Sequence, residues 1–263
     1  MSLSLKGKVV LVTAASKGIG LGVARVCASH GAKLAICSRS RANLKAATKL
    51  IIDESGAEVL PINADISAKK DALKVIRETM AGFNDLDVLV HNAGPPRSGS
   101  IMDLKDSDWN HAIRMLLLSP IWFTKTVLPT MLRKRRGRLI YLTSVSLKEP
   151  IRNLMLSNTV RIGVAGLVKS LATEFGQSGV TANGVMPGYI NTDRVNDLAR
   201  AQAKKTGKQF RQILKEYAGE VPVRRLGSPE EVGQAVAFLA SDAAAYINGS
   251  MITVDGGLLR SIL

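Results

Sequence analysis

A glycine-rich stretch near the N-terminus has the composition of a phosphate-binding turn. Its sequence, Thr13-Ala14-Ala15-Ser16-Lys17-Gly18-Ile19-Gly20, follows a short apolar run and leads into a helical pattern that continues to His30. Glycine lets the backbone approach a pyrophosphate, whose charge is stabilised by free N–H groups and by the positive end of the helix. The stretch therefore predicts a nucleotide site, although Ala14 replaces the first glycine and such turns also occur for structural reasons alone. The residues expected to contact the nucleotide are Thr13, Ala15, Ser16, Lys17, Gly18, Ile19 and Gly20.

The residues that end the next apolar run favour one nicotinamide cofactor over the other. In an NAD site, an acidic residue about twenty residues past the glycines bonds the ribose 2'-hydroxyl. Ser38 stands at that place here and is followed by Arg39. No carboxylate would repel a 2'-phosphate, and Arg39 with Lys17 could neutralise it. We therefore predict NADP(H) in preference to NAD(H); the alternative is that both are ordinary surface cations.

Seven apolar runs separated by helical patterns must position these residues. Strands separated by helix-length segments predict βαβ units and a parallel sheet. The runs are almost continuously apolar, as expected when helices cover both faces of the sheet. We predict a single-domain α/β Rossmann fold over residues 1–263, with a doubly wound, seven-stranded parallel sheet and helices on both faces. The predicted strands are Val9–Thr13, Lys33–Cys37, Glu58–Ile62, Asp87–His91, Arg138–Thr143, Val180–Met186 and Met251–Val254.

Length and composition restrict the class of protein further. A chain of 263 residues with 46% hydrophobic content can bury a large core. It has no run of eighteen uncharged apolar residues and no signal-peptide pattern, so we expect a cytoplasmic protein that does not act in a membrane. Cys27 and Cys37 lack CxxC spacing, and the three histidines, His30, His91 and His111, lack metal-ligand spacing. We therefore expect neither a disulfide scaffold nor a metal site.

The formal net charge of +15 indicates an anionic partner in its simplest interpretation. Nucleic acid, a membrane surface and a phosphate-bearing substrate would all fit, and so would a solvated surface rich in lysine and arginine. The chain lacks a motif of stacking aromatic residues, and its aromatic content is only 4%. We therefore do not expect a nucleic-acid partner.

Four further landmarks follow the glycine-rich turn along the chain. They are Asp65-Ile66, His91-Asn92-Ala93-Gly94, Pro187-Gly188-Tyr189-Ile190-Asn191-Thr192 and Val254-Asp255-Gly256-Gly257. In this order the five landmarks resemble the short-chain dehydrogenase/reductase family over essentially the whole chain. The resemblance implies that Asp65 and Ile66 lie near the adenine ring, that Asn92, Ala93 and Gly94 close the fourth strand, and that Pro187, Gly188, Ile190 and Thr192 lie beside the nicotinamide.

The resemblance also implies where the chemistry should be. In the family a serine orients the substrate carbonyl, a tyrosine donates the proton, a lysine four residues later holds the ribose, and an asparagine completes a proton relay. Ser144 matches the serine. The tyrosine position, thirteen residues onward, holds Ser157, and the lysine position holds Arg161. The asparagine position holds Leu116. YxxxK has become SxxxR, and three of the four catalytic residues are replaced.

These replacements change the chemistry that is available. A serine hydroxyl is a far poorer acid than a phenol and is shorter, so Ser157 would need a bridging water. Arg161 cannot pass on a proton, yet it can hydrogen-bond ribose hydroxyls and stabilise negative charge. Two repairs remain open. Tyr189 could serve as a substitute acid, or be simply part of the pocket wall; alternatively, Arg161 and Ser144 could stabilise an alkoxide that takes its proton from water at Ser157.

A basic segment at about 191–227 is the one irregular part of the pattern, and we predict that it is a substrate lid. Its charge would suit an acidic substrate, or an acyl group carried on CoA or acyl carrier protein. A second basic cluster, Arg133–Arg138, has a simpler explanation, since cations belong at helix C-termini. Reductases of the family that act on 3-oxoacyl carrier proteins use basic surface near such helices, so reduction of a 3-oxoacyl thioester is the leading activity.

Two interpretations of the whole chain stay open. The first is an NADP(H)-dependent reductase of a small-molecule carbonyl, or dehydrogenase of the alcohol, with a non-standard catalytic site. The second is a catalytically silent NADP(H)-binding sensor or scaffold. Retention of positive charge at Arg161 favours the enzyme. Apolar stripes on the predicted helices 106–135 and 154–177 correspond to helices that pair between subunits in the family, so we expect a homo-oligomer, a dimer or tetramer.

Overall fold

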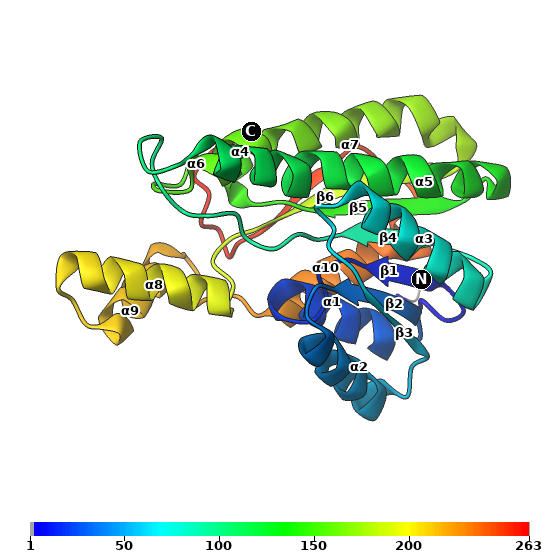
Figure 1. Cartoon of the computed structure of the whole chain (residues 1–263), viewed down its shortest axis with the longest axis horizontal. Helices are drawn as coiled ribbons and strands as arrows, with labels where there is room; N and C mark the ends of the chain where they lie inside the picture. Colours follow the sequence, from blue (N-terminus) through cyan, green and yellow to red (C-terminus); the bar gives the residue numbers. More distant parts are fainter. Residues whose placement is uncertain (1–2, 263) are drawn as a thin grey trace.

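Seven parallel strands form the centre of the molecule in a computed structural model that describes residues 3–262. Their order is β3-β2-β1-β4-β5-β6-β7, which confirms the predicted parallel sheet (Figure 1). Each predicted strand agrees with the observed one to within one residue at either end, because the strands are the most continuously apolar runs in the chain. The strands are β1 (Val9–Val12), β2 (Lys33–Ser38), β3 (Val59–Asn63), β4 (Val88–His91), β5 (Gly137–Leu142), β6 (Val180–Pro187) and β7 (Met251–Val254).

Helices cover both faces of the sheet (Figure 1). One face carries α1 (Gly18–Ser29), α2 (Arg41–Ser55) and α10 (Pro229–Ala240). The other carries α3 (Lys69–Phe83), α4 (Asp106–Ile113), α5 (Ser119–Lys134), α6 (Met155–Val160) and α7 (Ile162–Phe175). A π-helical turn, Arg114–Leu118, joins α4 to α5, and short 3-10 turns occupy Val145–Leu147, Gly176–Ser178 and Asp242–Ala244.

The core consists of two apolar clusters, one on each side of the sheet. Alternation along β1 shows how a strand supplies both: Val10 and Val12 belong to the cluster under α1 and α10, whereas Val9 and Leu11 belong to the cluster under α3 and α5. The continuous helix Asp106–Lys134 is long and apolar enough to cross a membrane by length and composition alone. Its buried side, which includes Phe123, packs on the sheet as a core helix does.

The segment after β6 differs from the expectation. The sequence predicted an irregular stretch at 191–227, but most of it forms two helices, α8 (Asp193–Thr206) and α9 (Phe210–Glu220). The prediction was wrong because few apolar residues suffice when they recur at helical spacing. Val195 and Ala199 on α8 pack with Ile213 and Tyr217 on α9 in a third, small cluster. Figure 1 shows this pair projecting beyond the layers of helices.

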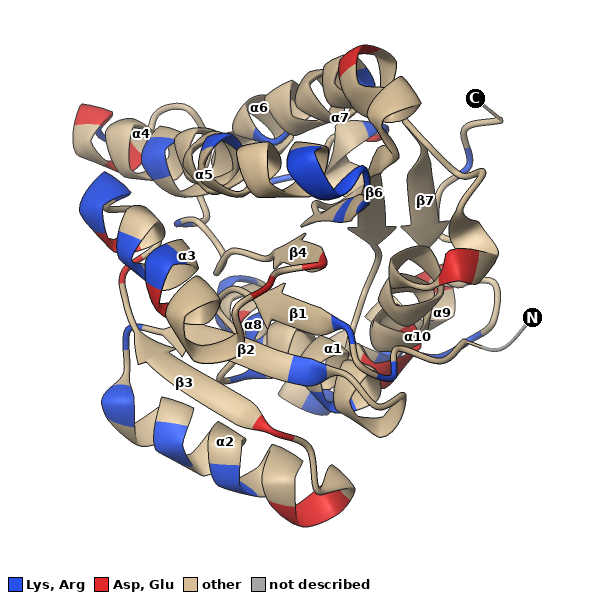
Figure 2. Cartoon of the chain, turned by 90° about the vertical axis from the view of Figure 1, so that its right-hand side faces the viewer, with Lys and Arg blue, Asp and Glu red and all other residues tan. Residues whose placement is uncertain are grey.

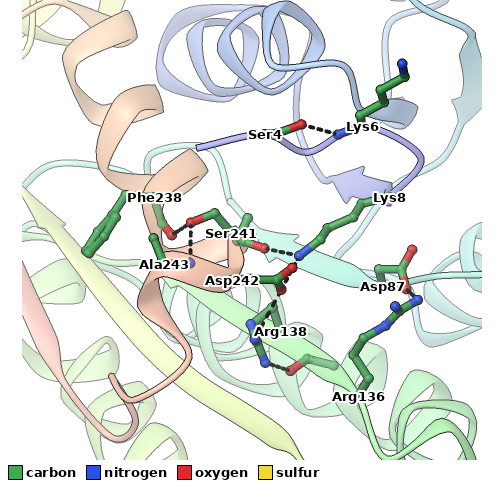
Figure 3. Close-up of polar contacts among 12 residues, drawn as sticks. Ser4, Lys6, Lys8, Asp87, Arg136, Arg138, Phe238, Ser241, Asp242 and Ala243 are labelled. Atoms are coloured by element: carbon green, nitrogen blue, oxygen red, sulfur yellow. Dashed lines mark hydrogen bonds and ion pairs between the residues drawn. The ribbon is translucent and has the colours of Figure 1, made fainter. Parts of the chain in front are cut away.

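The basic cluster Arg133–Arg138 is engaged within the chain at the amino edge of the sheet. Asp87 accepts from the Lys134 Nζ and from Arg136, each at 2.8 Å, while Arg138 and Lys8 both face Asp242 (Figure 3). Arg133 and Arg135 also bond within the chain, to the Thr130 hydroxyl and the Gln177 carbonyl. These contacts favour a structural role for the cluster over a docking role.

Candidate functional site

A cavity of about 510 Å³ opens at the carboxyl edge of the sheet, where the loops after six strands meet. Ligands in open parallel α/β sheets bind at this edge. Nineteen of the twenty-two residues that the sequence predicts for the site line this cavity. They are Ser16, Lys17, Gly18, Ile19, Ser38, Arg39, Asp65, Ile66, Asn92, Ala93, Gly94, Ser144, Ser157, Arg161, Pro187, Gly188, Tyr189, Ile190 and Thr192.

The three predicted residues that do not line the cavity shape it from behind. The Thr13 hydroxyl donates to the Asn92 carbonyl at 2.6 Å and accepts from the Asn92 N–H at 2.8 Å, which joins the loops after β1 and β4. Ala15 is fully buried. A Cβ on Gly20 would lie 2.5 Å from both the Ala14 carbonyl and the Asn92 amide nitrogen. Thr13, Ala15 and Gly20 therefore set the path of the turn without contacting a ligand directly.

The glycine-rich turn has the geometry that a pyrophosphate site needs. Gly18 and Ala14 both have left-handed backbone, with φ of 54° and 49°, so Ala14 adopts the conformation of the glycine it replaces. The Asn92 side chain holds the turn by donating to the Ala14 carbonyl at 3.1 Å. Helix α1 starts directly after Lys17, which contributes no side-chain cap. The N–H groups of the first helical turn are therefore not capped by that side chain and suit a bound phosphate.

One end of the cavity presents hydroxyls and a cation where an NAD site has a carboxylate. The Ser16 and Ser38 hydroxyls are hydrogen-bonded to each other at 2.7 Å. The exposed Arg39 guanidinium has no hydrogen bond or ion pair within residues 3–262. Asp65 accepts from the Ser67 N–H and hydroxyl at 2.9 and 2.8 Å. Burial alone would raise the pKa of Asp65, but these bonds and the Arg39 charge hold that pKa below its ordinary value.

Two serines of the cavity wall, Ser144 and Ser157, are connected near the end of β5 by a third, the buried Ser146. Ser144 caps the 3-10 turn Val145–Leu147, where its hydroxyl accepts from the Ser146 N–H at 3.1 Å. The Ser146 and Ser157 hydroxyls are hydrogen-bonded at 3.2 Å, and Ser157 is buried on α6. Ser146 thus connects the two predicted catalytic serines, a link that the sequence analysis missed. Its position two residues after Ser144 was the available signal.

Arg161 is a buried cation with incomplete hydrogen bonding. Only 8% of its surface is exposed, its Nη1 donates to the Leu142 carbonyl at 3.2 Å, and its Nε has no partner within residues 3–262. Burial, and after it the positive charge of Arg194, lowers the pKa of Arg161 to about 10. The structure therefore places a strongly destabilised positive charge on the cavity wall beside Ser157.

The position that corresponds to the relay asparagine is apolar in this structure. Leu116 is buried within the π-helical turn Arg114–Leu118, and its neighbour Met115 lines the cavity. His91 is also buried and is hydrogen-bonded to the Ser119 hydroxyl at 2.8 Å. Burial, followed by the charge of Arg161, lowers the pKa of His91 to about 3, so the imidazole is neutral near pH 7. Leu116 has no acidic proton, and the neutral His91 does not line the cavity, so neither Leu116 nor His91 is a proton donor for a substrate.

The structure speaks against Tyr189 as the substitute acid. Its ring stacks on Tyr217 with centroids 4.9 Å apart, and its hydroxyl donates to the Glu220 carboxylate at 3.3 Å. Burial and the Glu220 charge both raise the pKa of Tyr189 above its ordinary value, which makes the phenol a weaker acid. Tyr189 lines the cavity, but its hydroxyl is bonded to Glu220 of α9, so the wall interpretation fits better.

Arg194 is the most consequential cavity residue that the sequence analysis did not assign to the site. It lies in the first turn of α8 and lines the cavity. Its guanidinium makes no hydrogen bond or ion pair in the part of the chain that the structure describes. The available signal was its position two residues after Thr192, at the end of the segment expected beside the nicotinamide.

The described residues contain no group of three or more His, Cys, Asp or Glu side chains placed to hold a metal ion. Cys27 and Cys37 are free thiols, and burial raises the pKa of each to about 12. Neither thiol is therefore a nucleophile at neutral pH.

Comparison with known proteins shows which families and structures the chain is similar to. A family model described as "Enoyl-(Acyl carrier protein) reductase" matches residues 13–259. The chain is 35% identical to the oxidoreductase UcpA of Escherichia coli K12 over 257 residues, covering 96% of this chain and 95% of UcpA. It is 36% identical to the 3-oxoacyl-[acyl-carrier-protein] reductase FabG of the same strain over 256 residues, covering 97% and 99%. The L-sorbose reductase of Gluconobacter frateurii, solved with NADPH and L-sorbose, matches with a TM-score of 0.94, 28% identity and 100% coverage of both chains.

Proposed function

Because the chain belongs to the short-chain dehydrogenase/reductase family of oxidoreductases, we propose that it reduces a carbonyl group with NADPH, using Ser144, Ser157 and Arg161 as its catalytic residues. The observation that carries this proposal is the cavity of about 510 Å³ at the carboxyl edge of the sheet. One end of the cavity has the features of a phosphate site, and the other end has hydroxyls and a buried cation. This arrangement suits a long dinucleotide with a substrate beyond it.

The residues present fit the cofactor. The close approach of Gly20 to Ala14 and Asn92 leaves no room for a side chain, so the backbone of the turn is free to approach a pyrophosphate. Arg39 has no competing partner among the described residues, and the hydroxyls of Ser16 and Ser38 offer donors to a 2'-phosphate. These features support NADP(H) in preference to NAD(H). The reductase complex with NADPH supports the same preference.

The cofactor would supply a hydride to the carbonyl carbon, and the chain would handle the negative charge that develops on oxygen. The Ser144 hydroxyl is free to donate toward that oxygen, because the bond it makes from Ser146 uses it as an acceptor. Arg161 would stabilise the alkoxide by charge and by its unused N–H donors. Ser157, connected through Ser146, would hold the water that delivers the proton. Acid catalysis is weaker in such a site than with a phenol.

Our proposal for the substrate and its carrier is based on a relative of known activity. FabG is a 3-oxoacyl-[acyl-carrier-protein] reductase, so a 3-oxoacyl thioester on CoA or acyl carrier protein is one candidate for this chain. Figure 2 shows Lys and Arg on α2, α3 and α5, and the net charge of +15 would attract such an acidic carrier. We also propose that the protein is cytoplasmic, since free buried thiols suit a reducing compartment. We propose in addition that it forms a homo-oligomer, as the exposed Ile113 and Ile162 would favour.

The first test measures binding and turnover separately. NADPH and NADH are titrated into the protein, and oxidation of NADPH is then followed at 340 nm with 3-oxoacyl thioesters, ketones and aldehydes. We expect tighter binding of NADPH than of NADH, together with turnover of at least one carbonyl class. In the Ser144→Ala variant we expect turnover to fall by about 100-fold while NADPH binding stays within about 3-fold, as for loss of one donor to a developing oxyanion.

A matched control is Ser170→Ala, which removes a serine hydroxyl from exposed surface on α7. This variant should retain both binding and turnover. NADPH binding without turnover of any carbonyl would favour a silent sensor or scaffold instead. Absence of NADPH binding would contradict the proposed function altogether.

A further inference from the structure

Charged side chains on the cavity wall do not balance one another. Three carboxylates line the cavity, and each has a hydrogen-bond or ion-pair partner. The pairs are Asp65 with Ser67 (2.8 and 2.9 Å), Asp193 with Lys17 (4.0 Å) and Asp197 with Arg200 (2.9 Å). Three arginines on the same wall, Arg39, Arg161 and Arg194, have no hydrogen-bonded carboxylate anywhere in residues 3–262. Asp65 and Asp197 partly offset the charges of Arg39 and Arg194, whereas no described carboxylate offsets the charge of Arg161. Four cations therefore face three carboxylates on the wall, and the remaining positive charge favours an anionic group on a ligand.

The proposed cofactor accounts for only part of this surplus. Arg39 adjoins Ser38 and suits the 2'-phosphate, and the start of α1 suits the pyrophosphate. Arg161 and Arg194 remain. Arg161 lies on the same helical segment as Ser157, and its bond to Leu142 reaches the end of β5, two residues before Ser144. This pair of arginines therefore belongs to the reacting end of the cavity.

Both arginines line this cavity, and after burial the charge of Arg194 also lowers the pKa of Arg161. Arg161 has five N–H donors and uses one of them, on the Leu142 carbonyl. A buried cation whose charged neighbour has the same sign is costly unless an anion compensates it. Ribose hydroxyls could accept hydrogen bonds from Arg161, but they would bring no negative charge. A substrate carboxylate at the neighbouring Arg194 would supply that charge.

We propose that Arg194 binds a carboxylate of the substrate while Arg161 faces the reacting oxygen, so that the chain acts on a keto acid. This inference rests on the proposed reduction of a carbonyl and specifies its substrate class. The carboxylate itself does not react. A hydride from NADPH forms the new C–H bond, the C=O π bond breaks, the oxygen takes a proton from water, and the products are a hydroxy acid and NADP⁺. Arg194 is a specificity residue in this scheme, because it contacts the substrate away from the reacting carbonyl.

The test uses keto acids and their methyl esters, which differ in one negative charge. Suitable probes are 4-oxopentanoate, 4-oxocyclohexanecarboxylate and 4-acetylbenzoate, each with its ester. We expect kcat/KM to favour at least one acid over its ester by 10-fold or more. Arg194→Ala should lower kcat/KM for that acid by 10-fold or more, mainly through KM, and should leave the ester unchanged. Arg194→Lys should recover part of the loss.

A readout without turnover completes the design. Binding of each acid to the protein loaded with NADP⁺ is followed by calorimetry, in the wild type and in Arg194→Ala. Lys204→Ala is the matched control, because it removes one positive charge from an exposed position on α8 that does not line the cavity. It should change neither acid binding nor NADPH binding by more than about 2-fold.

The outcomes separate the inference from the function on which it rests. If esters are reduced as well as acids, or if no acid binds the NADP⁺ complex, the inference is wrong while carbonyl reduction can stand. If Arg194→Ala weakens NADPH binding as much as it weakens acid binding, the arginines serve the cofactor pyrophosphate and the inference is again wrong. If the wild type does not bind NADPH at all, the proposed function fails, and the inference fails with it.

Discussion

At the scale of single residues, the cavity has a weaker acid than a tyrosine at Ser157 and a buried positive charge at Arg161. A tyrosine would offer a phenolic proton, whereas Ser157 offers a hydroxyl of much lower acidity within a chain of serines. Arg161 contributes a positive charge that is available throughout the physiological range, because its pKa stays near 10 even when buried. Catalysis at such a site depends mainly on electrostatic stabilisation of the developing oxyanion.

The choice between NADP(H) and NAD(H) is also decided by single residues. In Arg39→Ala we expect the dissociation constant for NADPH to rise by about 10-fold, as for loss of one charge-assisted contact in an exposed position, and that for NADH to stay within about 2-fold. Fluorescence titration of both cofactors checks this. Lys45→Ala, which removes an exposed cation from α2 outside the cavity, serves as the control. Equal losses for both cofactors would show that Arg39 does not read the 2'-phosphate.

Tyr189 gives a second prediction at this scale. Its hydroxyl donates to Glu220 and its raised pKa makes it a poor acid, so Tyr189→Phe should keep turnover within about 3-fold of the wild type. Steady-state rates at saturating NADPH with the best carbonyl from the panel measure this. Tyr246→Phe, at a fully exposed phenol remote from the cavity, is the control. Abolished turnover in Tyr189→Phe alone would restore Tyr189 as the proton donor.

At the scale of elements, the amino edge of the sheet is held by one carboxylate. Asp87, just before β4, accepts from the Val9 N–H of β1 at 2.9 Å. It also accepts from Lys134 at the end of α5 and from Arg136 just after it, each at 2.8 Å. Asp87 is 4% exposed. Burial acts to raise the pKa of Asp87, but the bonds from Lys134 and Val9 and the neighbouring positive charges hold it below its ordinary value. A single charge therefore joins two strands to the end of a helix.

We expect Asp87→Asn to lower the free energy of unfolding by about 1–3 kcal/mol at pH 7, as for loss of a buried charged hydrogen-bonding group. Because the folded-state pKa is lowered, the ionised carboxylate stabilises the wild type above about pH 4, and this stabilisation is lost as the pH falls through the folded-state pKa. The difference between wild type and variant should therefore shrink below about pH 4. Urea unfolding at several pH values measures it, with Glu174→Gln, at an exposed carboxylate, as control. A difference that does not change with pH would contradict the role given to the charge.

At the scale of the whole molecule, the sequence predicted the framework better than the side chains it carries. The strands were predictable because runs such as Val9–Val12 are apolar on both faces. The two helices after β6 were missed because Val195, Ala199, Ile213 and Tyr217 form their small core only when both helices are present. For the same reason the orientation of Tyr189 and the place of Arg194 in the cavity were not predictable from residue types, since each depends on how α8 and α9 pack.

The predicted homo-oligomer can be tested at the same scale. The helices α4 and α7 leave apolar side chains uncovered, namely Ile113 and Ile162, which is 52% exposed. Association through this surface would bury them, so we expect light scattering to give a mass that is a multiple of the chain mass. A lysine in such an interface would be buried without a partner, so Ile162→Lys should shift the protein toward monomer. Leu73→Lys, at a comparably exposed apolar residue on α3, should leave the mass unchanged, and an equal effect of the two substitutions would argue against an interface on α7.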